Sequence, residues 1–96
     1  MSEASVSAPW RALAVTAQTM RQMDDDFVVY HPLSGATHQL DYLAGRILQL
    51  LIQTPATTAQ LISALDQEFS IDDQQDFADA LQTRLSELAA HSLVAQ

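Results

Sequence analysis

The stretch FVVYHPLSGATHQLD, residues 27–41, constrains the fold most strongly, because it places two strand-forming segments around a turn. Residues 27–30 are strong strand formers with apolar side chains on both faces, which is typical of a central strand. Pro32 ends this run, and the Ser-Gly pair that follows is a turn signal. Residues 37–41 alternate in polarity, as an edge strand with one solvent-exposed face does. The stretch therefore predicts a β-hairpin.

The length of the turn sets the register of this hairpin, and a slip of one residue exchanges its two faces. A two-residue turn would pair His31 with His38. A three-residue loop, residues 33–35, places Gly35 where a left-handed residue is needed and pairs Tyr30 with His38. We favour the three-residue loop.

The three-residue loop also predicts which side chains of the hairpin face the core. It pairs Val28 with Leu40 and places both on the core face. It gives His38 a structural role beside Tyr30, its partner on the other strand. Thr37 and Gln39 then point outward, along an edge that contains no Pro or Lys to discourage pairing with another strand.

The segment before the hairpin fits more than one structure. In residues 10–15, Leu13 and Val15 alternate as in a strand. The same region also fits helical spacing, through Trp10, Leu13, Ala17 and Met20. The aspartates at 24–26 predict a solvated turn.

Three amphipathic helices are predicted after the hairpin. Asp41 can cap the first helix, and Pro55 stops it. Thr57 begins the second, with Gln60 three residues on in a capping-box pattern. One of the aspartates at 72–73 opens the third, and Leu93 and Val94 are expected to close over the core. The inward stripes comprise Leu43, Ile47, Leu48, Leu50 and Leu51, then Leu61, Ile62, Leu65 and Phe69, then Phe77, Leu81, Leu85 and Leu88.

The charge of the chain disfavours nucleic acid as a partner. Its 96 residues carry a net charge of −8 at pH 7, with no lysine and only 4 arginines. Binding to DNA or RNA depends on basic side chains that neutralise phosphates, and this chain would repel them. An acidic surface suits peptide or protein partners that carry positive charge.

Length and composition predict a single soluble domain. The chain is too short for two cores, so we expect one domain at residues 10–96 after a flexible tail at residues 1–9. The first residues lack the basic charge of a signal peptide, and no apolar run approaches the roughly 20 residues of a membrane span. The chain has no cysteine, and a cytoplasmic location is expected by default.

The sequence predicts neither a catalytic site nor a cofactor. Cysteine is absent, no serine lies in a G-x-S-x-G turn, and 2 glycines cannot build a phosphate-binding loop. His31 and His38 flank the turn of the hairpin, but no third metal ligand is evident, and His91 is distant in sequence. We therefore interpret the histidines as structural and expect no metal.

The residues of the hairpin and first helix carry a resemblance to a known family. The order of elements, with strands first and three helices after, resembles PqqD, the peptide chaperone of pyrroloquinoline quinone biosynthesis and prototype of the elements that recognise leader peptides. More narrowly, the stretch VVYHPLSGATHQLDYLAGRILQLL is similar to the PqqD-family proteins of the HPr-rel-A system, which have a kinase-like neighbour. The match covers about residues 10–95, with its specific part at residues 27–51. The residues that carry it are Tyr30, Pro32, Ser34, Gly35, Thr37, His38 and Leu40.

The resemblance implies an α+β, winged-helix-like fold with an N-terminal three-stranded antiparallel sheet followed by a three-helix bundle. Residues 10–15 would then form the first strand of that sheet. The resemblance also implies a non-catalytic peptide-binding chaperone or adaptor, which binds a precursor or leader peptide and presents it to a modifying enzyme encoded nearby. The guest peptide would add a strand to the sheet edge and lie against the third helix.

The same resemblance assigns the residues of a peptide-binding groove. Thr37 and Gln39 would form one wall, and Phe77 and Leu81 on the third helix would form the floor. The complete expected set is Thr37, His38, Gln39, Leu40, Asp76, Phe77, Ala80, Leu81 and Arg84.

Two other functions remain open. A winged-helix regulator could bind DNA, although the third helix carries Asp72, Asp73, Asp76, Asp79 and Glu87 against Arg84 alone. A structural subunit could instead pair its exposed edge with another protein or with a second copy, so the chain would be a monomer or a homodimer.

Overall fold

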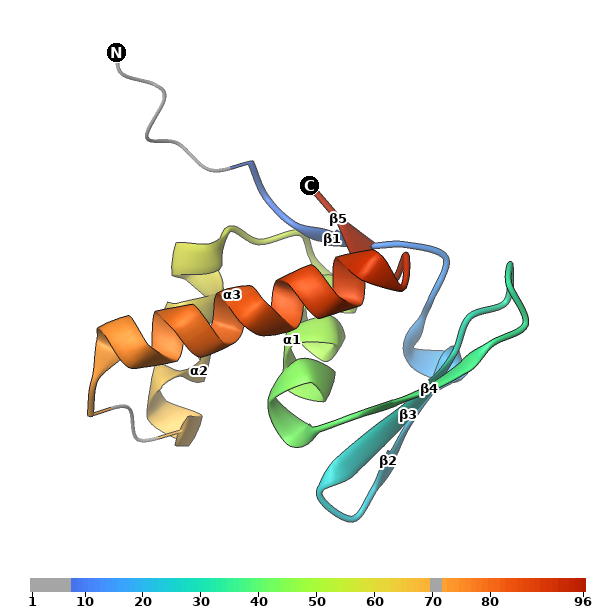
Figure 1. The fold of residues 1–96 in the computed structure, drawn as a ribbon, viewed down its shortest axis with the longest axis horizontal. Coiled ribbons are helices and arrows are strands. Elements are labelled where there is room, and N and C mark those ends of the chain that lie inside the picture. Colours follow the sequence, from blue (N-terminus) through green and yellow to red (C-terminus); the bar gives the residue numbers. More distant parts are fainter. Residues whose placement is uncertain (1–7, 70–71) are drawn as a thin grey trace.

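The computed structural model describes residues 8–69 and 72–96, so most of the tail expected at residues 1–9 lies outside the described residues. Strands occupy both ends of the described chain, and the helices lie between them (Figure 1). The elements in order are β1 (Arg11–Ala12), the 3-10 helix η2 (Ala17–Thr19), β2 (Met20–Met23), β3 (Asp26–Tyr30), β4 (Thr37–Leu40), α1 (Tyr42–Gln53), α2 (Thr58–Phe69), α3 (Gln74–Ala90) and β5 (Val94–Ala95).

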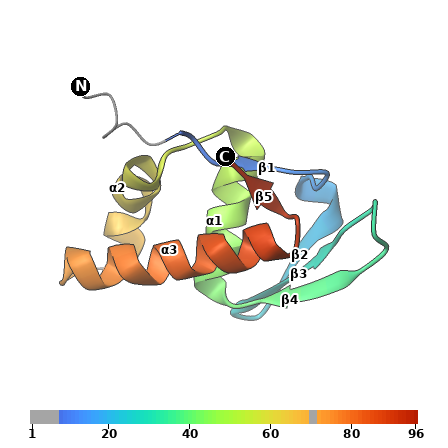
Figure 2. The same cartoon turned by 45° about the horizontal axis from the view of Figure 1, so that its top comes forward.

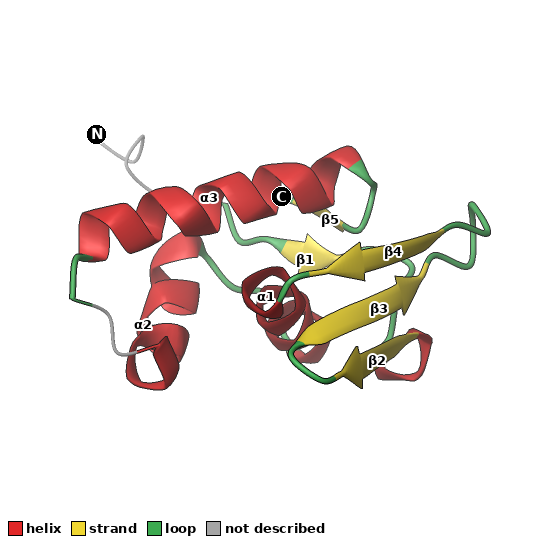
Figure 3. Ribbon diagram, turned by 60° about the horizontal axis from the view of Figure 1, so that its bottom comes forward, coloured by secondary structure: helices red, strands yellow, loops and turns green. Residues whose placement is uncertain are grey.

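The predicted architecture is confirmed, since an antiparallel three-stranded sheet precedes three helices in an α+β fold. The strand order is β2-β3-β4, which makes β3 central and β4 an edge (Figure 3). Asp24 and Asp25 form the turn between β2 and β3, with Asp24 at a left-handed φ of 58°.

The assignment of residues 10–15 to this sheet is wrong. The first strand of the three-stranded sheet is β2, whereas β1 pairs with β5 in a separate two-stranded sheet. Trp10 forms a bridge with Ala56, in the loop between α1 and α2. Ala14 has a left-handed φ of 58°, which ends the extended segment before it can reach β3.

The register predicted for the hairpin is also wrong, by one residue. Phe27 pairs with Leu40, and Val29 pairs with His38. The loop contains four residues, 32–35, because the His31 N–H donates to the Ala36 carbonyl over 2.8 Å and closes it. Its other closing bond runs from the Gly35 N–H to the His31 carbonyl, also over 2.8 Å. The left-handed conformation expected at Gly35 is present, with a φ of 75°.

This register changes the faces of the hairpin. Phe27, Val29 and Leu40 are buried on the core face, whereas Val28 is only half-buried on the other side of β3. His38 shares the core face with Leu40, as the three-residue loop also implied, but its partner on β3 is Val29 and not Tyr30. Thr37 and Gln39 are exposed, as predicted.

Local side-chain hydrogen bonds begin the helices where the sequence predicted. Asp41 caps α1 by accepting a bond from the Ala44 N–H over 2.9 Å. Thr57 and Gln60 form a reciprocal capping box before α2, with bonds of 2.8 and 3.2 Å. Asp73 caps α3 by accepting a bond of 3.1 Å from the N–H three residues on.

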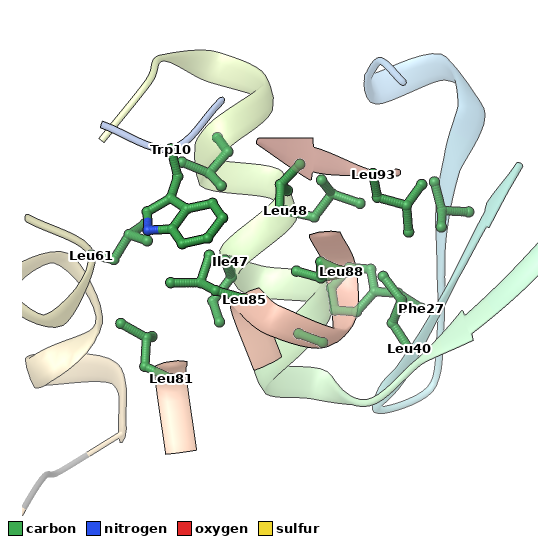
Figure 4. Packing of buried hydrophobic residues seen from close by; sticks show 14 of the residues in the cluster. Trp10, Phe27, Leu40, Ile47, Leu48, Leu61, Leu81, Leu85, Leu88 and Leu93 are labelled. Carbon is green, nitrogen blue, oxygen red and sulfur yellow. The ribbon is translucent and has the colours of Figure 1, made fainter. Parts of the chain in front are cut away.

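One apolar core joins the helices to the sheets (Figure 4). α1 packs against β3, and α3 packs against α1 and α2. Gly45 lies directly under the Phe27 ring, where a Cβ atom would overlap it. The buried core comprises Trp10, Val15, Phe27, Val29, Leu40, Ala44, Ile47, Leu48, Leu51, Leu61, Leu65, Leu81, Leu85, Leu88, Leu93 and Val94.

The C-terminal half of α3 lies beside β4, while its N-terminal half extends past the sheet toward α2 (Figures 2 and 3). The edge strand and the helix thus form two sides of one surface. In the described parts of the chain, no helix has the length and apolar character needed to cross a membrane.

Candidate functional site

A groove of about 420 Å³ lies between β4 and the C-terminal half of α3. Both polar and apolar side chains line it. β4 and the start of α1 supply one side, and successive turns of α3 supply the other. The lining residues are Thr37, His38, Gln39, Leu40, Asp41, Ala44, Arg84, Glu87, Leu88 and His91.

The backbone of β4 turns hydrogen-bonding groups toward the open edge. In an antiparallel pair, hydrogen-bonded and non-hydrogen-bonded residue pairs alternate. The bond from His31 to Ala36 makes these two residues a hydrogen-bonded pair, so every second pair along the hairpin is also hydrogen-bonded. His38 and Leu40 belong to such pairs and direct their N–H and C=O groups at β3. Thr37 and Gln39 direct theirs the other way. Among the described strands only β3 neighbours β4, so this edge can accept another strand.

An ion pair joins the two sides of the groove at the end where β4 meets α1. The Asp41 carboxylate accepts bonds from Arg84 Nε over 2.9 Å and from Nη2 over 2.7 Å. Burial raises the pKa of Asp41, but the bonds from Arg84 and the α1 backbone outweigh burial and hold the pKa below its usual value. Glu87, one turn further along α3, also stabilises the Arg84 charge, so this end of the groove carries two carboxylates around one cation.

Histidines gather at the opposite end of the groove. The rings of His38 on β4 and His91 at the C-cap of α3 lie with their centroids 4.6 Å apart. Burial lowers the pKa of His38, and the charges of His91 and then His31 lower it further. Within residues 8–69 and 72–96, no cluster of three or more potential ligands could hold a metal ion.

His31 differs from the other two histidines because its ring is already hydrogen-bonded within the protein. It is buried, and its Nε2 lies 3.1 Å from the Ser92 carbonyl oxygen, which can only accept. Nε2 therefore carries the proton, and Nδ1 is left to accept the Ser34 N–H over 3.4 Å. His31 thus joins the hairpin loop to the end of α3 through its ring.

The expected site residues divide into two groups. Those that line the groove are Thr37, His38, Gln39, Leu40 and Arg84. Asp76, Phe77, Ala80 and Leu81 do not line it, because α3 runs antiparallel to β4 and Arg84 already lies level with Asp41 at the end of the strand. Phe77 packs on Phe69 with ring centroids 5.6 Å apart, and Leu81 is fully buried.

The sequence reasoning missed groove residues on both sides. Asp41 was expected only as a cap, and Glu87, Leu88 and His91 were not expected in the groove. A helical signal for the last three was present, since they follow Arg84 at spacings of three, four and seven residues on one helix face.

Comparisons with known proteins identify similar chains. The family model described as coenzyme PQQ synthesis protein D (PqqD) matches residues 26–94. A solved structure described as TbiB1 in complex with the TbiA(beta) leader peptide is 26% identical to this chain, with a TM-score of 0.70. That match covers 88% of this chain and 93% of the other. The comparison with curated proteins gave no match.

Proposed function

The chain belongs to the PqqD family, and on this premise we propose that it is a non-catalytic chaperone that binds the leader segment of a precursor peptide and presents it to a modifying enzyme. The similar structure TbiB1 is described in complex with a leader peptide, which supports a peptide as the partner of this chain. Three points stay predictions: the narrower likeness to HPr-rel-A proteins, the cytoplasmic location, and the state as monomer or homodimer.

The observation that carries the proposal is the open edge of β4 beside α3. The N–H and C=O groups of Thr37 and Gln39 supply four hydrogen-bonding positions for an added guest strand. An antiparallel guest would continue the sheet, since antiparallel pairs are the commoner kind and the sheet is already antiparallel. Its inward side chains would then lie opposite His38 and Leu40, over the groove.

This arrangement gives main-chain and side-chain recognition different roles. Backbone bonds to Thr37 and Gln39 would supply affinity that is largely independent of the guest sequence. Leu40 and Leu88 are buried in the core at the base of the groove, so side chains that lie over them determine which guests fit. Arg84 and His91 would contact the guest from the α3 side.

The alternative of DNA binding receives no support from α3. The cationic side chain Arg84 is paired with Asp41 and has Glu87 as a neighbour. Exposed Asp73, Asp76 and Asp79 add negative charge along the same helix, which would repel phosphates.

The test is a titration of ¹⁵N-labelled protein with a candidate precursor peptide encoded nearby, with a scrambled peptide as control. We expect amide shifts concentrated at residues 37–41 and 84–91. The absence of shifts at saturating peptide would refute the proposal. Sedimentation of the free protein, run in parallel, tests whether a second copy occupies the β4 edge instead.

A further inference from the structure

We propose that the guest strand carries a carboxylate side chain, from Asp or Glu, that accepts hydrogen bonds from the adjacent imidazoles of His38 and His91. This inference rests on the proposed function, because it names the chemistry of the guest that occupies the β4 edge. The two rings, 4.6 Å apart, belong to opposite sides of the groove, so a side chain entering from above meets both.

The first argument is that these two rings have unused hydrogen-bonding capacity. Both ring nitrogens of His31 have partners within the protein. Among the described residues, the ring nitrogens of His38 and His91 form no hydrogen bond. His38 is half-buried and His91 is exposed at the C-cap of α3, so both can reach a bound peptide. Imidazole N–H groups are donors, and a carboxylate accepts from two donors at once.

The second argument is the separation of charge along the groove. At one end, Arg84 is paired with Asp41 and has Glu87 as a second carboxylate neighbour. At the other end, β4, the hairpin loop and α3 bring His38, His31 and His91 together. No carboxylate in residues 8–69 and 72–96 forms an ion pair with any of the three. An incoming carboxylate would be the hydrogen-bonded anion that His38 and His91 do not have among the described residues.

The net charge of −8 on the whole chain acts against an acidic guest, but only weakly at this site. At physiological ionic strength, charges separated by more than about 8 Å are largely screened. A hydrogen bond between an imidazolium and a carboxylate in direct contact is screened much less. The local donors therefore decide which side chain is preferred.

The register of the sheet converts this preference into a sequence pattern. On an antiparallel guest, the residue opposite Leu40 and the residue opposite His38 lie on the same face, two positions apart. The first lies over the apolar base formed by Leu40, Ala44 and Leu88, and the second lies over the rings of His38 and His91. Because an antiparallel guest passes Leu40 before His38, its pattern is an apolar residue, any residue, and then Asp or Glu.

Binding of the carboxylate would be coupled to proton uptake. In the free protein, burial and the two neighbouring histidines keep the pKa of His38 below its usual value. A carboxylate hydrogen-bonded to the two rings favours the charged imidazolium and raises the pKa of His38. Affinity for an acidic guest therefore increases as the pH falls from about 8 to about 6.

The test uses the full chain and a library of random peptides of about ten residues, displayed and selected at about pH 6. We expect enrichment of the apolar-x-acidic pattern. In a selected peptide, replacing Glu with Gln should weaken binding about tenfold at pH 6 and about twofold at pH 8, where His38 carries less positive charge. His91→Ala should remove this difference between Glu and Gln peptides. The matched control Gln82→Ala, on the exposed outer side of α3, should retain it.

The outcomes separate this inference from the proposed function. Selected peptides that shift the amides of residues 37–41 but show no acidic preference would overturn the inference and leave the chaperone proposal standing. An acidic preference that survives His91→Ala would also overturn it. If no peptide is enriched over empty support and the candidate precursor causes no amide shifts, the proposed function is refuted, and this inference is refuted with it.

Discussion

Gln39→Pro is the substitution that tests strand addition most directly. Because the N–H of Gln39 points away from β3, proline at this position removes a donor from the open edge and none from the β3–β4 ladder. Proline is tolerated in edge strands with this orientation. The exposed Gln39 side chain forms one further bond, from Nε2 to Asp26 Oδ2 over 3.2 Å. Gln39→Ala removes that bond but keeps the backbone N–H, and is the matched control.

The expected magnitudes differ clearly between the two variants. In the complex, the guest carbonyl opposite Gln39 would lose its partner beside α3, and leaving a buried acceptor unsatisfied costs about 1–3 kcal/mol. This corresponds to a Kd about 5- to 150-fold weaker for Gln39→Pro. For Gln39→Ala we expect a change within about 0.5 kcal/mol, as for most surface substitutions. The free energy of unfolding should fall by less than about 1 kcal/mol in Gln39→Pro, since no ladder bond is lost.

The assay is fluorescence anisotropy with a labelled precursor peptide, accompanied by thermal unfolding of each variant. The reasoning predicts weak binding by a folded Gln39→Pro protein and near-normal binding by Gln39→Ala. Equal affinities for the two variants would show that the guest does not pair with the β4 backbone. Loss of binding in both would instead assign recognition to the Gln39 side chain.

Three further predictions concern stability and titration. Gly45→Ala should lower the free energy of unfolding by about 1–3 kcal/mol, because its Cβ would overlap the buried Phe27 ring; a thermal midpoint equal to that of the unsubstituted protein would contradict this packing. Asp41→Asn keeps a capping side chain but loses the ion pair, so we expect a loss of about 0.5 kcal/mol at this half-exposed site. Since the folded pKa of Asp41 is depressed, that difference should be complete above about pH 4 and disappear as the pH falls through the folded pKa, which denaturant titrations over a pH series can measure. The pKa of His38 is lowered first by burial and next by His91. His91→Ala should therefore raise the pKa of His38 in NMR titrations of the free protein. An unchanged pKa would show that the His91 ring does not influence His38.

Features that depend on local sequence were predictable. The cap at Asp41 and the capping box of Thr57 and Gln60 need only residues three apart, and these bonds form as expected. The outward direction of Thr37 and Gln39 was also predicted, although the favoured register was one residue off. Slipping β3 by one residue exchanged its faces but left the exposed face of β4 unchanged.

Features that depend on distant residues were not predictable in the same way. β2, with the sequence MRQM, is largely exposed and lacks β-branched residues, so pairing with β3 determines its structure more than its own composition does. The four-residue hairpin loop depends on the His31 ring, which is held by the carbonyl of Ser92 at the far end of the chain. The position of His91 beside His38 likewise follows from how α3 packs, which helical periodicity alone does not reveal.

The pairing of β1 with β5 also determines how this fold can be connected to other polypeptides. Arg11 lies opposite Ala95, and the Gln96 side chain donates a hydrogen bond to the Ala8 carbonyl over 3.0 Å, so the two ends of the described chain emerge together (Figure 2). A short Gly/Ser linker could join them, with new ends opened at the exposed Asp24-Asp25 turn, to give a circular permutant. The same proximity would let the domain be inserted into a surface loop of a host enzyme, with both connections leaving from one point. Neither β1 nor β5 pairs with β4, so such a graft leaves the open edge of the larger sheet unchanged.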